Sequence, residues 1–416
     1  MDHTHEGFEH LTNVDDALEI FLKTVEKHRP KRELQPLASC VGRVLAEDVA
    51  ANQDLPLFDR SVMDGFAIRS LDVQTALPSF PIVLDVIGES RLGQDCRTIV
   101  KRLQAVSVAT GSILPKGADC VVPIEDIFQV SKHRISLTSP VVRGQNILHK
   151  GEDFSRGKVI LEAGQRLRPQ DLGALRVLGF AKVRVAAKPR VGVMSTGSEL
   201  VEKSARMLRS KIVDINRLIL LEMVAECGGE GVDLGIVDDD QQSILDALRK
   251  ALRSCNFILV SGGSSMGQRD LVPECIDMLG RPGMMVHGVA MRPAMPTGLA
   301  LVNHVPIISL PGVPVSAIFA FRVFGLPMIS RLLGAQEVTT ATARAVLSEK
   351  VRGVLGYRLF VRVKLNRTER GLVADPLKSQ KSAVLKSMVD ADAYVVIPEG
   401  VNEIQANETV EVTLLR

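Results

Sequence analysis

The chain has 416 residues, of which 46% are hydrophobic and 24% charged, a composition typical of globular proteins with large buried cores. This length predicts about two to four domains. The formal net charge is only +3, from 51 basic and 48 acidic residues, and 4% of the residues are aromatic, so an interface with nucleic acid or an anionic membrane is not expected.

The N-terminal region predicts one helix, a loop and a β-rich domain. Apolar residues recur at helical spacing over 13–28. A loop is expected over 52–70, where Asp64 precedes Gly65, and both an Asx-turn and a functional role are open for this carboxylate. From 80 to 149, apolar residues alternate with a period near 2 between closely spaced turns, which is typical of short strands.

Strands and helices alternate over 188–333, and this pattern predicts a mostly parallel, three-layer α/β domain. Within it, the apolar stretch 257–260 is typical of a strand buried on both faces. It leads into Ser261-Gly262-Gly263-Ser264-Ser265, whose small residues let backbone N–H groups approach an anion, and Asp270 follows. An ordinary strand-to-helix turn is the alternative interpretation of this loop.

The same arrangement occurs once more, upstream. An apolar strand predicted over 191–194 is followed by Ser195-Thr196-Gly197-Ser198 and then by Glu199. Ligands of open α/β sheets bind beyond the carboxyl ends of the strands, so the two loops would place Glu199 and Asp270 on the same rim. The pair of loops therefore predicts an anion-binding site in which acids hold a divalent cation.

Asp239 and Asp240 follow the predicted strand at 232–237. Their simplest role is to cap the helix predicted over 241–254, because carboxylates stabilise the positive end of a helix. Their position at the carboxyl end of a strand also permits metal binding, and the sequence leaves both roles open.

Short alternating strands recur over 341–416, which predicts a small β-barrel or sandwich. The expected order along the chain is therefore a helical entry, a β domain, an α/β domain and a second β domain.

The cysteine pattern and the N-terminus bear on the compartment. Six widely spaced cysteines without a C-x-x-C pair favour a reducing compartment. Residues 1–10 lack the pattern of a signal peptide, and no uninterrupted apolar run approaches the ~18 residues of a membrane span. We therefore expect a cytoplasmic protein without a membrane span.

Taken together, these motifs resemble the MoeA family of molybdopterin molybdenumtransferases, which includes the E domain of gephyrin. The resemblance runs from about Val14 to the C-terminus. It is carried by Ser61-Val62-Met63-Asp64-Gly65-Phe66-Ala67, Ala109-Thr110-Gly111, Leu114-Pro115-Lys116-Gly117-Ala118-Asp119, Gly151-Glu152-Asp153, Ser195-Thr196-Gly197-Ser198-Glu199-Leu200, Ser261-Gly262-Gly263 through Asp270, and Leu310-Pro311-Gly312.

The resemblance implies a multidomain α/β plus β protein. Its centre would be a three-layer α/β domain of the MoaB/MogA type, with a β-rich insert domain and a small C-terminal β-barrel. The expected limits are 1–51 with 149–187 for a mixed linking and dimerisation domain, 52–148 for the β-rich domain, 188–335 for the molybdopterin-binding domain and 336–416 for the barrel.

The resemblance also implies an enzyme of molybdenum cofactor biosynthesis. Adenylylated molybdopterin and molybdate would be its substrates and Mg²⁺ its cofactor; the pyrophosphate bond would be hydrolysed and AMP released. Family members are homodimers with the active site between subunits, and a MogA-like adenylyltransferase or a peptide is an implied further partner. The alternatives are a gephyrin-like scaffold that binds a peptide, with weak or no transferase activity, and a paralogue that handles tungstate.

Carried onto this sequence, the family's site falls on a defined set of residues. Catalytic roles are expected for Asp64, Glu199 and Asp270, and metal binding for Glu199, Asp239, Asp240 and Asp270. Substrate binding is expected for Thr110, Asp153, Ser195, Thr196, Gly197, Ser198, Ser261, Gly262, Gly263, Ser264, Arg292, Pro311, Gly312, Arg362 and Ser382.

Two stretches depart from the family's pattern. Arg292-Pro293-Ala294-Met295-Pro296 stands where members often carry Lys-Pro-Gly-Lys-Pro, so one positive charge is kept and one is lost. Leu310-Pro311-Gly312-Val313-Pro314 replaces the usual Leu-Pro-Gly-Asn-Pro and loses a side-chain amide. The apolar Met295 and Val313 motivate the scaffold alternative, whereas the retained acids favour the enzyme.

Overall fold

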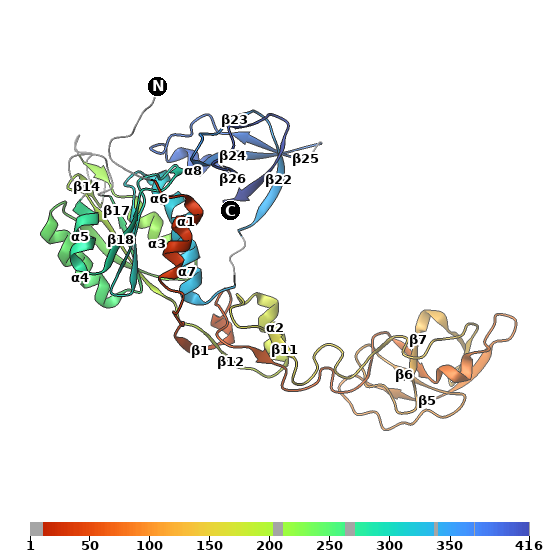
Figure 1. Cartoon of the computed structure of the whole chain (residues 1–416). Coiled ribbons are helices and arrows are strands. Elements are labelled where there is room, and N and C mark those ends of the chain that lie inside the picture. The colour runs from red at the N-terminus through yellow and green to blue at the C-terminus, as the bar shows by residue number, and fades with distance from the viewer. Residues whose placement is uncertain (1–10, 203–210, 263–270, 337–339, 370, 416) are drawn as a thin grey trace. The chain divides into compact units, whose positions relative to one another are not determined.

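The computed structural model describes residues 11–202, 211–262, 271–336, 340–369 and 371–415 (Figure 1). The chain forms two compact units. One contains 1–46, 164–168 and 183–416, and the other contains 47–163 and 169–182. Each unit has its own buried apolar clusters between its elements.

A six-stranded sheet lies at the centre of the first unit. Its strand order is β16-β13-β17-β21-β20-β18; the first four strands run parallel, and β20 is antiparallel to both of its neighbours. The strands span Glu230–Val237 (β16), Arg190–Thr196 (β13), Phe257–Ser261 (β17), Val305–Leu310 (β21), Gly298–Val302 (β20) and Pro282–His287 (β18). All five residues of β17 are buried, as expected for a parallel strand covered on both faces.

Helices cover both faces of this sheet, which confirms the predicted three-layer α/β domain (Figure 1). One apolar cluster joins one face to α1, α3, α6 and α7, and a second cluster joins the other face to α4 and α5. The helices span Val14–Lys23 (α1), Asn216–Glu226 (α3), Gln241–Ser254 (α4), Leu271–Leu279 (α5), Pro314–Ala320 (α6) and Leu326–Leu333 (α7).

Helix α4 shows how the sequence specifies these layers. Its buried residues Ile244, Leu245, Leu248 and Ala251 recur at helical spacing and pack on the sheet. The helix begins after Asp240, whose carboxylate accepts a hydrogen bond from the Ser243 N–H at 2.9 Å. The predicted capping role of Asp240 is therefore present in the structure.

A long apolar helix lies in the core of the first unit. Helices α6 and α7 join through the π-helical turn Phe321–Gly325 into a continuous helix over Pro314–Leu333, and its length and composition alone would allow it to cross a membrane. Within its most apolar window, however, 72% is buried inside the protein. Its apolar character reflects a core position on one face of the sheet.

The C-terminal part of the first unit is a closed five-stranded barrel, which settles the choice between barrel and sandwich. The strand order is β24-β25-β22-β28-β26, and β24 also pairs with β26, which closes the sheet on itself. The strands span Arg358–Thr368 (β24), Gly371–Pro376 (β25), Thr342–Leu347 (β22), Thr409–Leu414 (β28) and Ala393–Ile397 (β26). A two-stranded pair of Val351–Arg352 (β23) and Glu403–Ile404 (β27) and helix α8 (Lys386–Asp390) accompany it.

The second unit is β-rich, as predicted. Its main sheet has the order β7-β4-β6-β5-β9-β8, with helix α2 (Pro169–Val177) in the same unit. The strands span Cys120–Pro123 (β7), Gly65–Ile68 (β4), Gln104–Val108 (β6), Ile82–Ser90 (β5), Arg134–Leu137 (β9) and Phe128–Ser131 (β8). Across both units, four of the six cysteines are buried and all six are free, so the buried ones pack as small apolar residues.

The carboxyl ends of three parallel strands meet at one edge of the central sheet. Ser195 of β13 pairs in register with Ser261 of β17, and Ser261 pairs with Leu310 of β21. The backbone then turns sharply at Gly262, which has φ +106° and donates its N–H to the Leu310 carbonyl at 3.1 Å. A Cβ atom at Gly262 would overlap the Thr196 carbonyl oxygen, so only glycine lets the two loops come this close.

We expect Gly262→Ala to lower the free energy of unfolding by about 2–3 kcal/mol, because it combines backbone strain with a steric overlap. Gly312→Ala is the matched control: a Cβ there would lie 3.5 Å from the Gly262 Cα, an ordinary contact. Thermal denaturation of both variants measures the difference. Equal melting temperatures for the two variants would contradict the close approach.

Candidate active site at the carboxyl ends of the parallel strands

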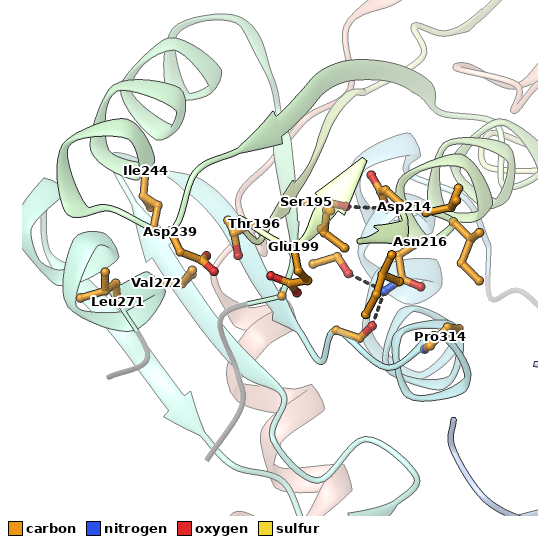
Figure 2. Close-up of a pocket in the computed structure, with 17 residues that line it drawn as sticks. Ser195, Thr196, Glu199, Asp214, Asn216, Asp239, Ile244, Leu271, Val272 and Pro314 are labelled. Atoms are coloured by element: carbon orange, nitrogen blue, oxygen red, sulfur yellow. Dashed lines mark hydrogen bonds between the residues drawn. The ribbon is translucent and has the colours of Figure 1, made fainter. Parts of the chain in front are cut away.

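A cavity of about 440 Å³ opens where β13, β17 and β21 end (Figure 2). Both predicted loops contribute to its wall, as does the helix α3. The lining residues are Ser195, Thr196, Glu199, Leu200, Ile212, Val213, Asp214, Ile215, Asn216, Asp239, Ile244, Ser261, Gly262, Leu271, Val272, Gly312 and Pro314. The sequence prediction that the two loops share one rim is therefore consistent with the position of this cavity.

A hydrogen bond to Asp214 fixes the first predicted loop, 195–198, at its start. Ser195 and Thr196 are buried, and the Ser195 hydroxyl donates to Asp214 at 3.0 Å. Gly197 and Ser198 do not line the cavity; the Ser198 carbonyl instead accepts a hydrogen bond from Lys211 Nζ at 2.7 Å. The loop thus presents its first two residues and Glu199 to the cavity.

Asn216, the first residue of α3, connects the other two loops. Its side-chain amide donates to the Ser261 hydroxyl and to the Gly312 carbonyl, both at 2.8 Å (Figure 2). Its carbonyl oxygen Oδ1 is buried and has no hydrogen-bond partner within the described part of the chain. A buried acceptor without a partner is costly, so Oδ1 is a candidate for contact with a bound polar group.

Two acids face the cavity from different loops. In Figure 2 the Asp239 carboxylate points toward Thr196 and the neighbouring Glu199. Desolvation and the negative charge of Glu199 raise the pKa of Asp239. This electrostatic coupling shows that the two carboxylates are close enough to repel each other.

A third acid in the wall is already neutralised. The Asp214 side chain is only 2% exposed and accepts a hydrogen bond from Arg217 Nε at 3.0 Å. Arg217 also pairs with Asp233 and Glu202, at 2.5 Å and 3.1 Å. The guanidinium supplies the partner that a buried carboxylate needs, and this ion pair anchors the start of α3.

Glu199 and Asp239 are the predicted metal ligands that the structure brings together. Asp240 does not line the cavity, because it caps α4, and Asp270 lies outside the described residues, as do Gly263 and Ser264. Among the residues that the structure describes, no group of three or more His, Cys, Asp or Glu side chains is arranged to hold a metal.

Mg²⁺ prefers oxygen ligands and is commonly held by one or two carboxylates together with substrate phosphates. Two mutually repelling carboxylates in one cavity provide this donor set. The residues at the cavity therefore fit a Mg²⁺ ion that shares its coordination with a bound substrate.

Three further predicted residues lie in the second unit. Thr110 donates through both its backbone N–H and its hydroxyl to Asp64 Oδ1, at 2.7 Å and 3.0 Å. These two hydrogen bonds lower the pKa of Asp64, because they stabilise its ionised form. Asp153 is exposed, and its backbone N–H donates to the Leu55 carbonyl.

Three of the remaining predicted residues, Arg292, Arg362 and Ser382, lie in or beside the barrel. Arg292 and Ser382 line a second cavity of about 460 Å³ together with Gln380. Arg362 of β24 is completely buried, and none of its three guanidinium nitrogens has a hydrogen-bond partner within the described chain. Pro311 is buried and lies outside the cavity wall.

Asp214 and Asn216 are cavity residues that the sequence reasoning missed. Asp214 follows the short strand Ile212–Val213 (β15), which pairs in parallel with Leu200–Val201 (β14). A strand followed by an acid is also the pattern that singled out Asp239 and Asp240 after the predicted strand at 232–237. The signal was present, but two residues are too few for periodicity to detect a strand.

Comparisons with known proteins cover almost the whole chain. Residues 12–179 match the MoeA N-terminal region (domain I and II), 192–331 match a probable molybdopterin binding domain, and 344–415 match the MoeA C-terminal region (domain IV). The first described residue of α1 and the last strand of the barrel both fall within these matches.

Two curated relatives are bacterial proteins named molybdopterin molybdenumtransferase. The protein from Bacillus subtilis is 33% identical over 383 residues, which cover 91% of this chain and 89% of that protein. The protein from Staphylococcus aureus is 30% identical over 378 residues, which cover 91% and 90%.

A solved structure gives the same result. The molybdopterin biosynthesis MoeA protein from Pyrococcus horikoshii superposes with a TM-score of 0.85 at 33% identity and covers 97% of this chain and 100% of that chain. Sequence identity at this level, over nine-tenths of both partners and with the same fold, leaves one conclusion: the chain belongs to the MoeA family.

Proposed function

We propose that this protein is a molybdopterin molybdenumtransferase that converts adenylylated molybdopterin and molybdate into molybdenum cofactor and AMP. In this reaction the two dithiolene sulfurs bind molybdenum, and one oxo ligand of molybdate leaves as water with the two thiol protons. Water cleaves the P–O–P bond, so that AMP leaves and the phosphate monoester stays on the cofactor.

The observation that carries this proposal is the pairing of Glu199 and Asp239 in a cavity at the carboxyl ends of β13 and β17. This edge is where open α/β sheets bind their ligands. An anionic substrate would be repelled by two carboxylates alone, so the site requires a cation when substrate binds.

The cavity wall supplies polar contacts beside the acids. Ser195 and Thr196, the last two residues of β13, line the cavity together with Gly262. The buried Oδ1 of Asn216 is positioned to accept a hydrogen bond from an N–H group, such as those on the pterin ring.

The buried Arg362 side chain is evidence for an anionic ligand that binds beside the barrel. Burial lowers the pKa of its guanidinium, yet arginine remains charged in proteins. A fully buried charge without a counter-ion is strongly unfavourable, so the site favours a bound anion. Substrate phosphate is the anion that this reaction provides.

Mg²⁺ would be held by Glu199 and Asp239. When bound, it neutralises charge on the pyrophosphate and polarises the phosphorus–oxygen bond that breaks. The chain's own contribution is to hold the two carboxylates at fixed positions, through the Ser195–Asp214 hydrogen bond on one side and the α4 cap on the other.

The proposal includes the homodimer and the cytoplasmic location that the resemblance implies. Asp64, Thr110 and Asp153 belong to this part of the proposal, because the family's pattern assigns them to the active site. Sedimentation of the purified protein tests the dimer directly.

We expect Glu199→Gln to lower the rate of AMP release from adenylylated molybdopterin at least 100-fold, since about 2.7 kcal/mol of transition-state stabilisation would be lost with one metal ligand. Glu202→Gln is the control, because Glu202 is exposed and pairs with Arg217 outside the cavity wall. AMP release is measured by chromatography with molybdate and Mg²⁺ present. Normal turnover by the Glu199 variant would remove this carboxylate from the mechanism.

Asp239→Asn should make the Mg²⁺-free protein more stable at pH 7. The folded state raises the pKa of Asp239, so its ionised form destabilises the fold above that pKa, and the destabilisation disappears as the pH falls through it. The gain in melting temperature should therefore be present at pH 7 and shrink toward acidic pH.

The same variant tests metal binding. Mg²⁺ at ten times its dissociation constant should stabilise the wild-type protein by about 1.4 kcal/mol, and Asp239→Asn should lose most of this effect. Asp238→Asn removes one negative charge from the neighbouring residue, which does not line the cavity, and this variant should retain the stabilisation by Mg²⁺. An equal response to Mg²⁺ in both variants, measured by differential scanning calorimetry, would argue against Asp239 as a ligand.

A further inference from the structure

The segment that departs from the family's Lys-Pro-Gly-Lys-Pro pattern is built into the barrel. Met291–Arg292 forms the strand β19, which pairs in parallel with β24 so that Met291 lies opposite Arg358 and Arg292 opposite Leu359. The Arg358 N–H donates to the Ala290 carbonyl at 2.9 Å. The backbone around Arg292 is therefore fixed by the barrel.

The position of β24 is itself fixed by an ionic cluster. The guanidinium of Arg358 binds both carboxylate oxygens of Asp15, at 2.8 Å and 2.7 Å, and also pairs with Glu399 at 3.1 Å. The Arg358 and Glu399 side chains are 20% and 19% exposed, so this pair is less screened by solvent than the contact with Asp15, which is 72% exposed. Asp15 belongs to α1, so the cluster ties the barrel strand to the α/β layers.

The Arg292 side chain has a different environment. It is exposed, and it forms no ion pair with another described residue. Its guanidinium carbon lies 4.5 Å from the centre of the Tyr357 ring, within the range of a cation–π interaction. The Tyr357 hydroxyl lies 4.0 Å from the Met295 sulfur, so this one aromatic residue contacts both the retained cation and the residue where the second cation is lost.

We propose that Tyr357 is a positioning residue that holds the Arg292 guanidinium at the wall of the cavity shared with Gln380 and Ser382, ready to bind an anionic group of the substrate. This inference rests on the proposed function. A lone flexible arginine loses rotamer freedom when it binds an anion, and the ring reduces that loss by restricting the side chain beforehand. Tyr357 thereby offsets part of the loss of the second cation.

The proposal is tested with Tyr357→Leu, Tyr357→Phe, Arg292→Ala and the double variant Arg292→Ala/Tyr357→Leu. A cation–π contact at an exposed site corresponds to a two- to fivefold effect on binding. We expect Tyr357→Leu to raise KM for adenylylated molybdopterin by this factor with kcat unchanged. Tyr357→Phe, which keeps the ring, should restore the wild-type KM.

The double variant separates positioning from a general structural role. If Tyr357 acts through Arg292, then Tyr357→Leu should add nothing in the Arg292→Ala background. Independent, multiplicative effects of the two substitutions would overturn the proposal, as would a Phe variant as impaired as the Leu variant. Leu355→Ala, at an exposed residue of the same turn that is outside the cavity wall, is the control for local disturbance.

A second readout keeps this test distinct from that of the proposed function. The dissociation constant of inorganic pyrophosphate is measured for the same set of variants by calorimetry. If the wild-type protein releases no AMP, the proposed function fails, and coupling between Tyr357 and Arg292 in pyrophosphate binding still supports the positioning role. Additive effects on pyrophosphate binding would reject it in either case.

Discussion

The hydrogen bonds of Asn216 are the constraint on which the candidate site depends. Three parallel strands end at one edge of the sheet, and their loops would separate without a connection, because backbone beyond a strand has no ladder to hold it. Asn216 joins two of these loops with one amide group, and the Ser195–Asp214 hydrogen bond fixes the third. The two anchoring side chains, Asp214 and Asn216, lie two residues apart where β15 leads into α3, so a single short segment sets the shape of the cavity.

The acids around the cavity fall into two classes: one is paired with a basic side chain of the protein, and the others are not. Asp214 is buried and paired with Arg217, and its charge is balanced within the protein. Glu199 and Asp239 repel each other and, within the described part of the chain, neither forms an ion pair with a basic side chain. A protein that needed these carboxylates only for stability would pair them, so the unbalanced charge favours a role in binding a cation.

The layers of this protein could be predicted from the sequence because the spacing of apolar residues in a strand or helix repeats over many consecutive residues. The buried strand β17 and the amphipathic helix α4 were both recognisable from their apolar spacing. The sequence could not decide between capping and metal binding for Asp239 and Asp240, because both roles use a carboxylate after a strand. The structure gives the cap to Asp240 and directs Asp239 to the cavity, a difference of one residue that no periodicity resolves. The pairing of β19 with the barrel was equally hidden, since two residues carry no pattern.

The two departures from the family's pattern bear on the choice between enzyme and scaffold. Val313 precedes α6 without a side-chain cap, so the missing amide weakens a helix start, but the cavity is lined by its neighbours Gly312 and Pro314 and not by Val313. Met295 likewise lies outside the wall of the second cavity and packs toward Tyr357. Neither Val313 nor Met295 lines a cavity wall, and the acids Glu199 and Asp239 of the family's pattern line the cavity at the strand ends. The apolar substitutions are therefore compatible with catalysis, and the balance of charge in the site favours the enzyme over a scaffold.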